Sequence, residues 1–180
     1  MKVESLITLS KKAFIFAFYY IMAILIAIFS VGILSLMFKV FLVTVQGPTT
    51  FTQISEIVTY YMTLSIASFL LFRSYGKGHL QNKPKTFFLF IALIPVFHAV
   101  QLIFVELPTI YLFKGSLQLA QFLYTNGGHL ESIREIPRFY HLISIAIEDI
   151  CFIVFSLFGY FKSRQQYPKA EHVIKRLDEK

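Results

Sequence analysis

The sequence has few charged residues, one cysteine and none of the short motifs that mark common enzyme sites. Charged residues make up 15% of the 180-residue chain, and ten acids stand against 17 Lys and Arg. The single cysteine, Cys151, excludes an intrachain disulfide and has no metal-binding spacing around it. The sequences His-Glu-x-x-His, Gly-x-Ser-x-Gly and Cys-x-x-Cys do not occur. We therefore predict no catalytic residue, no metal and no cofactor, and expect a protein that is not an enzyme.

The chain is rich in apolar residues. Hydrophobic residues make up 56% of the chain, 21 residues are Phe, and the mean hydropathy is +0.65. This composition is typical of membrane proteins. The net charge of +7 does not indicate nucleic-acid binding, because the basic residues stand between and after apolar runs. The expected partners are the lipid bilayer and either another membrane protein or a second copy of the chain.

Four segments are long and apolar enough, at about 20 residues, to span a membrane as helices. The fold class we predict is all-α: a polytopic membrane protein in which a four-transmembrane-helix bundle occupies residues 1–162 and a cytoplasmic tail occupies 163–180. The first segment is far longer than the ~7 to 15 residue core of a signal peptide, so we expect an uncleaved anchor. The predicted spans are 13–38, 54–72, 86–107 and 139–161.

The basic residues predict the orientation of these spans. Three precede the first span, four lie between the second and third, and six follow the fourth, against four in the other connections. Positive residues collect on the cytoplasmic side of membrane proteins. We therefore expect an integral protein of a bacterial cell membrane with both termini in the cytoplasm. The cytoplasmic set is Lys2, Lys11, Lys12, Arg73, Lys77, Lys83, Lys85, Lys162, Arg164, Lys169, Lys175, Arg176 and Lys180; the outer set is Lys39, Lys114, Arg134 and Arg138.

The outer connection between the third and fourth spans covers residues 108–138. Its first half is too apolar for a free loop, but the apolar stretch from Tyr111 to Tyr124 is too short for another span. Polar residues from Lys114 to Thr125 fall on one helical stripe and apolar residues on another, which predicts an amphipathic helix at the outer surface. Asn126-Gly127-Gly128 would end this helix. We expect a short second helix over about 130–136, and a cytoplasmic helix from His172 onward.

Two adjacent acids, Glu148 and Asp149, lie in the middle of the fourth span. Counting 1.5 Å per residue from Lys162 places them about 21 and 20 Å into the membrane, and counting from Lys85 places His98 about 20 Å in. Ionisable groups at this depth need a partner or water, so they mark a candidate site. We predict that His98, Glu148 and Asp149 form an intramembrane polar cluster.

Other polar residues predict a second layer nearer the outer surface. Glu106 and His141 both come to about 31 Å by the same count. On the fourth span Ser144 and Glu148 continue the stripe of His141, whereas Asp149 is turned by about 100°. One carboxylate can therefore face His98, and the other needs a different neighbour. The predicted outer polar layer is Glu56, Gln101, Glu106 and His141.

Three functions compete for these residues. In the leading hypothesis the protein is a non-enzymatic accessory, regulatory or immunity-type membrane component, and His98, Glu148 and Asp149 pair to fix the register of its helices. The alternative is a proton- or ion-linked transporter subunit that uses the same layer as a relay. Four helices without an inverted repeat would then have to oligomerise.

A metal or hydrolytic site is the third hypothesis. His141 and Glu148 are about 10.5 Å apart along the helix, too far to bind one ion together. Ser144 lies one turn from each of them, but a triad on a single helix has no oxyanion site. The sequence therefore favours the first two hypotheses.

Overall fold

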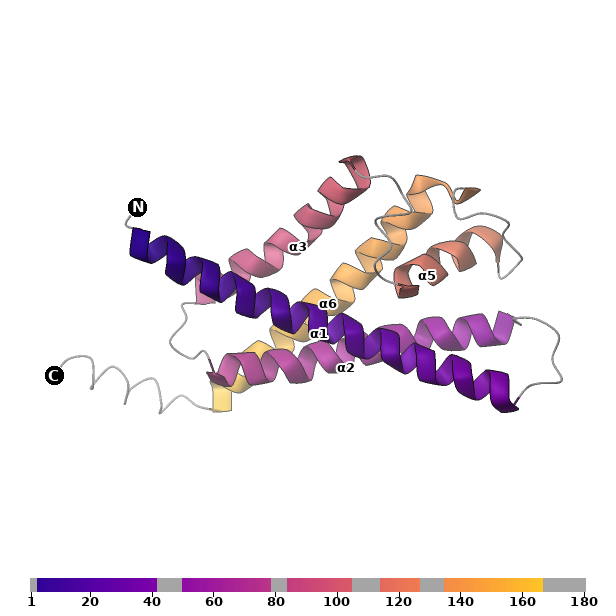
Figure 1. The fold of residues 1–180 in the computed structure, drawn as a ribbon, viewed down its shortest axis with the longest axis horizontal. Coiled ribbons are helices and arrows are strands. Elements are labelled where there is room, and N and C mark those ends of the chain that lie inside the picture. The colour runs from indigo at the N-terminus through magenta and orange to yellow at the C-terminus, as the bar shows by residue number, and fades with distance from the viewer. Residues whose placement is uncertain (1–2, 42–49, 79–83, 105–113, 127–134, 167–180) are drawn as a thin grey trace.

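The structure is a computed structural model that describes residues 3–41, 50–78, 84–104, 114–126 and 135–166. Its regular elements are all α-helices, and no strand occurs in these ranges. Figure 1 shows a long α1 that lies obliquely across the other helices. The elements are α1 (Val3–Phe41), α2 (Thr50–Gly78), α3 (Pro84–Phe104), α5 (Lys114–Thr125) and α6 (Arg138–Gln166).

Three of these helices are long and apolar enough to cross a membrane: Ile7–Phe38 of α1, Phe51–Gly78 of α2 and Arg138–Gln165 of α6. In α3 the segment Pro84–Val100 is apolar but shorter. The chain is thus an all-helical integral membrane protein, as the composition predicts. The helix that contains the predicted second span is longer than the span, since α2 runs from Thr50 to Gly78. Charged residues end an apolar run, but Arg and Lys are good helix formers and do not end a helix.

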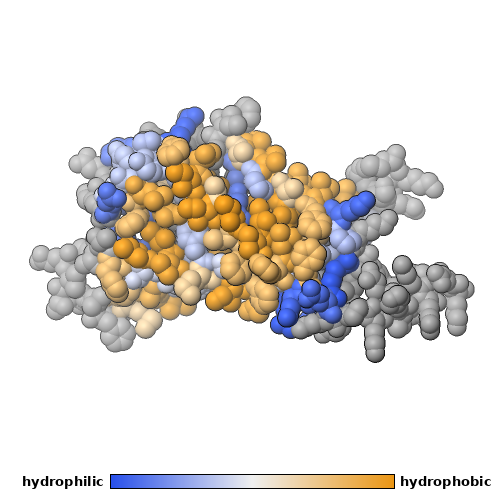
Figure 2. Space-filling view, turned by 180° about the vertical axis from the view of Figure 1, so that it is seen from behind, coloured by the Kyte–Doolittle hydropathy of each residue, from blue (hydrophilic) through white to orange (hydrophobic). Residues whose placement is uncertain are grey.

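The surface of the described residues fits a bilayer rather than water. Figure 2 shows apolar residues over the middle of one face and hydrophilic residues toward its ends. Large apolar side chains are exposed on every long helix, among them Phe14, Phe29, Met62, Phe97 and Phe158. In water an apolar surface of this extent would drive association, whereas lipid tails cover it at no cost.

Close contact between α2 and α6 forms the centre of the bundle. A Cβ atom added to Gly159 would lie 2.2 Å from the carbonyl oxygen of Phe69, and one added to Gly76 would lie 2.0 Å from Ser163 Oγ. Ser156 and Ser163 on α6 are fully buried. Small residues allow membrane helices to approach closely enough for strong van der Waals contact. The α2–α6 contact therefore depends on the absence of side-chain bulk at these positions.

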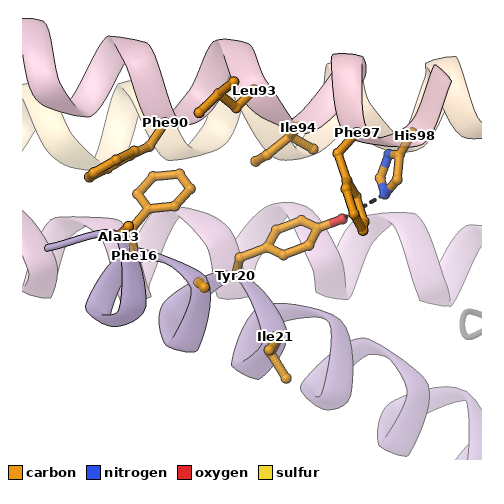
Figure 3. A pocket seen from close by; sticks show the side chains of 10 residues that line it. Ala13, Phe16, Tyr20, Ile21, Phe90, Leu93, Ile94, Phe97 and His98 are labelled. Carbon is orange, nitrogen blue, oxygen red and sulfur yellow. Dashed lines mark hydrogen bonds between the residues drawn. The ribbon is translucent and has the colours of Figure 1, made fainter. Parts of the chain in front are cut away.

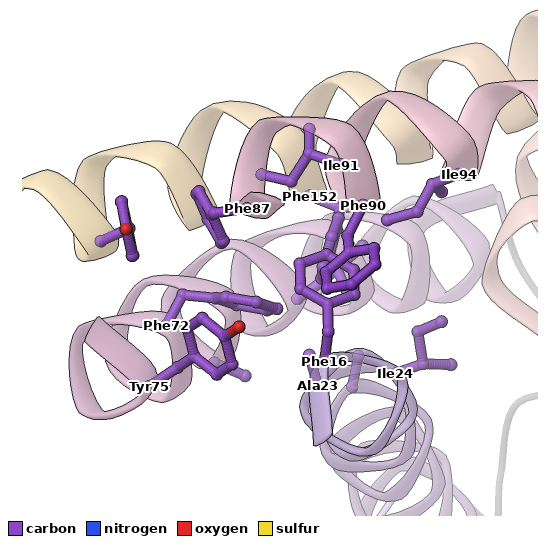
Figure 4. Packing of buried hydrophobic residues seen from close by; sticks show 14 of the residues in the cluster. Phe16, Ala23, Ile24, Phe72, Tyr75, Phe87, Phe90, Ile91, Ile94 and Phe152 are labelled. Carbon is purple, nitrogen blue, oxygen red and sulfur yellow. The ribbon is translucent and has the colours of Figure 1, made fainter. Parts of the chain in front are cut away.

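An aromatic cluster joins α1, α2, α3 and α6 (Figure 4). The Phe72 ring centroid lies 5.2 Å from that of Phe16 and 5.4 Å from that of Phe152. Phe87 of α3 stacks on Tyr160 of α6 with centroids 3.9 Å apart. Such pairs contribute about 0.5–1.5 kcal/mol each beyond the area they bury. The cluster attaches α3 to the three other long helices.

The short helix α5 packs on α6 and α2. Its Ala120 is fully buried, and its Gln118 donates a hydrogen bond from Nε2 to Glu56 Oε2 on α2. The helix ends at Thr125, and Asn126 follows with a φ of 51°, the left-handed conformation that terminates many helices. The predicted second outer helix at about 130–136 falls mainly outside the described residues. The predicted tail helix from His172 falls outside them entirely.

Candidate functional site

The predicted polar cluster has a hydrogen-bonded pair of His98 and Asp149 at its centre. His98 Nδ1 on α3 lies 2.8 Å from Asp149 Oδ1 on α6, and both side chains are less than a tenth exposed. An ionised carboxylate accepts hydrogen bonds and cannot donate them, so His98 Nδ1 carries a proton and donates to Asp149. Hydrogen bonds to charged groups are about twice as strong as those between neutral groups. This bond fixes the level of α3 relative to α6.

Tyr20 of α1 extends the pair to a third helix. Its hydroxyl lies 3.1 Å from His98 Nε2 (Figure 3). With Nδ1 bonded to Asp149, a neutral imidazole has Nε2 free to accept, and the Tyr20 hydroxyl donates to it. The Tyr20 ring also packs edge-on against Phe152, with centroids 4.8 Å apart. Tyr20, His98 and Asp149 therefore form one hydrogen-bonded chain across α1, α3 and α6.

Glu148 has a different environment from its neighbour. The side chain is 3% exposed, and its carboxylate lies within electrostatic range of Tyr60 and Tyr61 on α2. The Tyr61 hydroxyl donates to the backbone carbonyl of Ser144, 3.3 Å away and one turn before Glu148. The stripe of α6 that carries Ser144 and Glu148 thus faces α2, while Asp149 faces α3.

The seam beside Glu148 contains further polar groups. Ser65 Oγ on α2 donates to the carbonyl of Tyr61 at 2.7 Å. The half-buried Cys151 lies against Ser65 and near Glu148. A serine that bonds to its own helix presents little polarity to its neighbour. Cys151 therefore packs as a small residue in the α2–α6 contact.

The structure describes the side chains of two of the four residues predicted as an outer layer, Glu56 and His141. Glu56 bonds to Gln118 of α5, which is a contact the sequence did not predict. His141 is fully buried near the start of α6. Gln101 lies in the last turn of α3, and its side chain is not described; Glu106 lies outside the described residues. The outer layer as a whole remains a prediction.

The three tyrosines around the acids, Tyr20, Tyr60 and Tyr61, were missing from the predicted site. Each lies in an apolar run, where a tyrosine counts as hydrophobic in any composition measure. The available signal was the hydroxyl, because a tyrosine buried in a membrane needs a hydrogen-bond partner at its own level. Adjacent tyrosines occur at positions 19–20 and 60–61, on the two helices whose tyrosines contact the polar cluster.

A crevice opens between α1 and α3 beside this site. Its volume is about 470 Å³. The walls are apolar, and Tyr20 and His98 close one end (Figure 3). Phe16 and Phe90, whose centroids are 5.4 Å apart, lie toward the other end. The polar chain is therefore reached from an apolar space rather than a polar channel.

Within the described residues, no three His, Cys, Asp or Glu side chains group as ligands for a metal ion. Comparison with protein-family models, with curated proteins and with solved structures found no match. The helices and their apolar surface define the chain as an all-helical integral membrane protein. Its distinctive features are the hydrogen-bonded chain Tyr20–His98–Asp149 and the crevice beside it.

Proposed function

We propose that the protein is a four-span, non-enzymatic accessory component of a cell membrane that acts through its helices on a larger membrane assembly. The observation that carries this proposal is the chain Tyr20–His98–Asp149, which joins three helices of the same molecule. Groups bonded to one another in this way stabilise one arrangement of the helices. A defined arrangement is what a small bundle needs to present a constant surface to a partner.

In this proposal α3 also spans the membrane, together with α1, α2 and α6. Its 21 residues would extend over about 32 Å at 1.5 Å per residue, close to the ~30 Å hydrocarbon core. Pro95 inside the helix is compatible with a membrane span, because neighbouring helices can satisfy the freed carbonyl. The bond between His98 and Asp149 supports the same placement, since it holds α3 at the depth of the middle of α6.

Both termini lie in the cytoplasm in the proposed topology. An even number of spans brings the two ends to one side, and the basic residues before α1, between α2 and α3, and after α6 are those expected there. The amphipathic α5 then lies on the outer side, where its contact with Glu56 holds it against α2.

The partner in this proposal is another membrane protein that contacts one lipid-facing side of the bundle. Lipid-exposed aromatic residues such as Phe29 on α1 and Phe158 on α6 provide rigid contact area for it. Apolar burial drives no association between helices in lipid, so the partner would have to match the shape of this side.

Photocross-linking in cells tests the accessory role. A photoreactive phenylalanine analogue is placed singly at Phe29, Leu70 and Phe158, and at buried Phe72 as the control. We expect a discrete protein adduct from one exposed position and none from Phe72. Adducts to lipid alone at all three exposed positions would contradict the accessory role.

Proton-linked transport is the second candidate, and a specific observation favours it. Glu148 and Asp149 share one depth but contact different helices, so the bundle has two separately placed carboxylates at its middle. Two such groups are what a proton relay requires. A proton flux in liposomes that is lost in Glu148→Gln, while the folded yield is kept, would support transport over the accessory role.

A further inference from the structure

The crevice between α1 and α3 has the dimensions of one lipid chain in one leaflet. Its lining runs from Ala13 to Ile21 on α1 and from Phe90 to His98 on α3, so its two ends are eight residue steps apart on each helix. At 1.5 Å per residue each wall is about 12 Å long. One leaflet of a ~30 Å hydrocarbon core is about 15 Å thick. Each wall is therefore nearly as long as one leaflet is thick.

The interior of the crevice suits hydrocarbon. Its volume of about 470 Å³ lies within the ~300–1,000 Å³ of typical ligand pockets. Ala13 and Ala17 leave the space open on α1, and Leu93 and Ile94 form the opposite wall. At the mid-membrane end the Tyr20–His98 bond occupies the facing polar atoms. A headgroup would have to leave the interface to reach this end, whereas the tip of a lipid chain normally lies in the middle of the bilayer.

Basic residues precede the lining segments of the crevice on both helices. Lys12 immediately precedes Ala13, with Lys11 before it, and Lys85 lies five residues before Phe90. Lys11 and Lys85 are exposed, and Lys12 is half-exposed. Clustered lysines at the interface between two membrane helices attract anionic headgroups. Charge at the entrance and hydrocarbon inside together describe an amphiphile with an anionic head.

We propose that this crevice binds one anionic phospholipid, with an acyl chain between α1 and α3 and the phosphate at Lys11, Lys12 and Lys85. The proposal rests on α3 being a membrane span but not on the accessory role. The bound chain fills the space that α1 and α3 leave between their two contacts, Phe16–Phe90 and Tyr20–His98.

The absence of tryptophan makes a direct test possible. A single tryptophan is introduced by Leu93→Trp in the crevice, or by Ala92→Trp on the same helix as the control. Ala92 is also exposed, is one residue away, and is turned by about 100° from Leu93. Fluorescence is measured in vesicles that contain brominated phosphatidylglycerol or, at the same mole fraction, brominated phosphatidylcholine. Bromine on the lipid chain quenches a neighbouring indole.

We expect an association constant about fivefold larger for the anionic lipid at Leu93→Trp, and near-equal constants at Ala92→Trp. Fivefold corresponds to one basic residue near an anionic headgroup. Adding Lys11→Gln, Lys12→Gln and Lys85→Gln together should remove the preference, and adding Ala17→Leu should reduce quenching by both lipids. If Leu93→Trp does not fold, Phe97→Trp reports on the same crevice.

Two results would overturn the proposal, and they differ in meaning. Equal quenching by the two lipids at Leu93→Trp, unchanged by the lysine substitutions, would exclude a site for anionic lipid and leave the four-span topology intact. A lack of quenching by either lipid at both Leu93→Trp and Ala92→Trp would place this part of α3 outside the bilayer and overturn the span as well.

Discussion

Asp149 bonds to His98 on α3 at 2.8 Å, whereas the adjacent Glu148 faces the tyrosines of α2. Consecutive residues on a helix point about 100° apart, so two adjacent acids meet two different helices. One acid belongs to a hydrogen-bonded chain through α3 to α1, and the other to the close contact between α2 and α6. Two acids that look alike in the sequence therefore hold different parts of the bundle.

Tyr20→Phe removes the hydroxyl from the chain without changing the packing volume. The loss of one hydrogen bond should lower the free energy of unfolding by about 0.5–1.5 kcal/mol. Equilibrium unfolding in mixed detergent micelles measures this loss. Tyr19→Phe is the matched control, because the Tyr19 ring packs on Phe72 and Tyr75 one residue away. An equal loss in the two variants would contradict a specific role for the Tyr20 hydroxyl.

Gly159→Ala tests the close contact between α2 and α6. The new Cβ would lie 2.2 Å from the carbonyl oxygen of Phe69, and this backbone atom cannot move away cheaply. Overpacking of this kind costs about 1–3 kcal/mol, and the yield of monodisperse protein should fall. Gly32→Ala is the control, since nothing lies within 4 Å of a Cβ there. If Gly32→Ala loses as much protein as Gly159→Ala, helix packing is not the cause.

Gln118→Ala should release α5 from α2. The lost bond to Glu56 involves a carboxylate and is worth about 1.5–3 kcal/mol, so backbone amides of α5 should exchange with solvent about tenfold faster or more. Hydrogen exchange with mass spectrometry measures this rate. Gln121→Ala lies on the same helix and serves as the control. Unchanged exchange in Gln118→Ala would mean that the bond does not hold α5.

The proposed topology predicts which positions are accessible from outside. In a Cys151→Ser background, a cysteine at exposed Asn126 should react with a membrane-impermeant maleimide on intact cells. A cysteine at exposed Gly78 should react only after the membrane is opened. The reverse pattern would invert the orientation, and labelling of both positions on intact cells would contradict four spans.

Long apolar runs predicted the membrane class and the places of α1, α2, α3 and α6, because a bilayer demands about 20 apolar residues per span. Counting residues also put His98 level with Asp149. The count works for this pair because α3 and α6 are both regular helices that run in opposite directions. Charged residues were a poor guide to helix ends, and α2 extends through Arg73 and Lys77 to Gly78.

The sequence did not predict the other contacts of the site, because they depend on how the helices cross. By the same count Tyr20 lies about 12 Å from Lys12, whereas His98 lies about 20 Å from Lys85, yet the two side chains are in contact. α1 begins at Val3 and lies obliquely to α3 and α6 (Figure 1), so Lys12 does not mark the same level as Lys85. Gly159 is a single glycine in an apolar run, and nothing in the sequence indicates that α2 is the helix that packs against it.

A double-mutant cycle on His98 and Asp149 tests most directly the claim that the mid-membrane acids hold the bundle together. The free energy of unfolding is measured in detergent micelles for the unchanged protein, His98→Phe, Asp149→Leu and the double variant. Each single variant leaves its partner buried and should lose about 1–3 kcal/mol. The double variant should lose less than the sum by at least ~0.6 kcal/mol, the mean coupling of such pairs in membranes. Additive losses would contradict the claim.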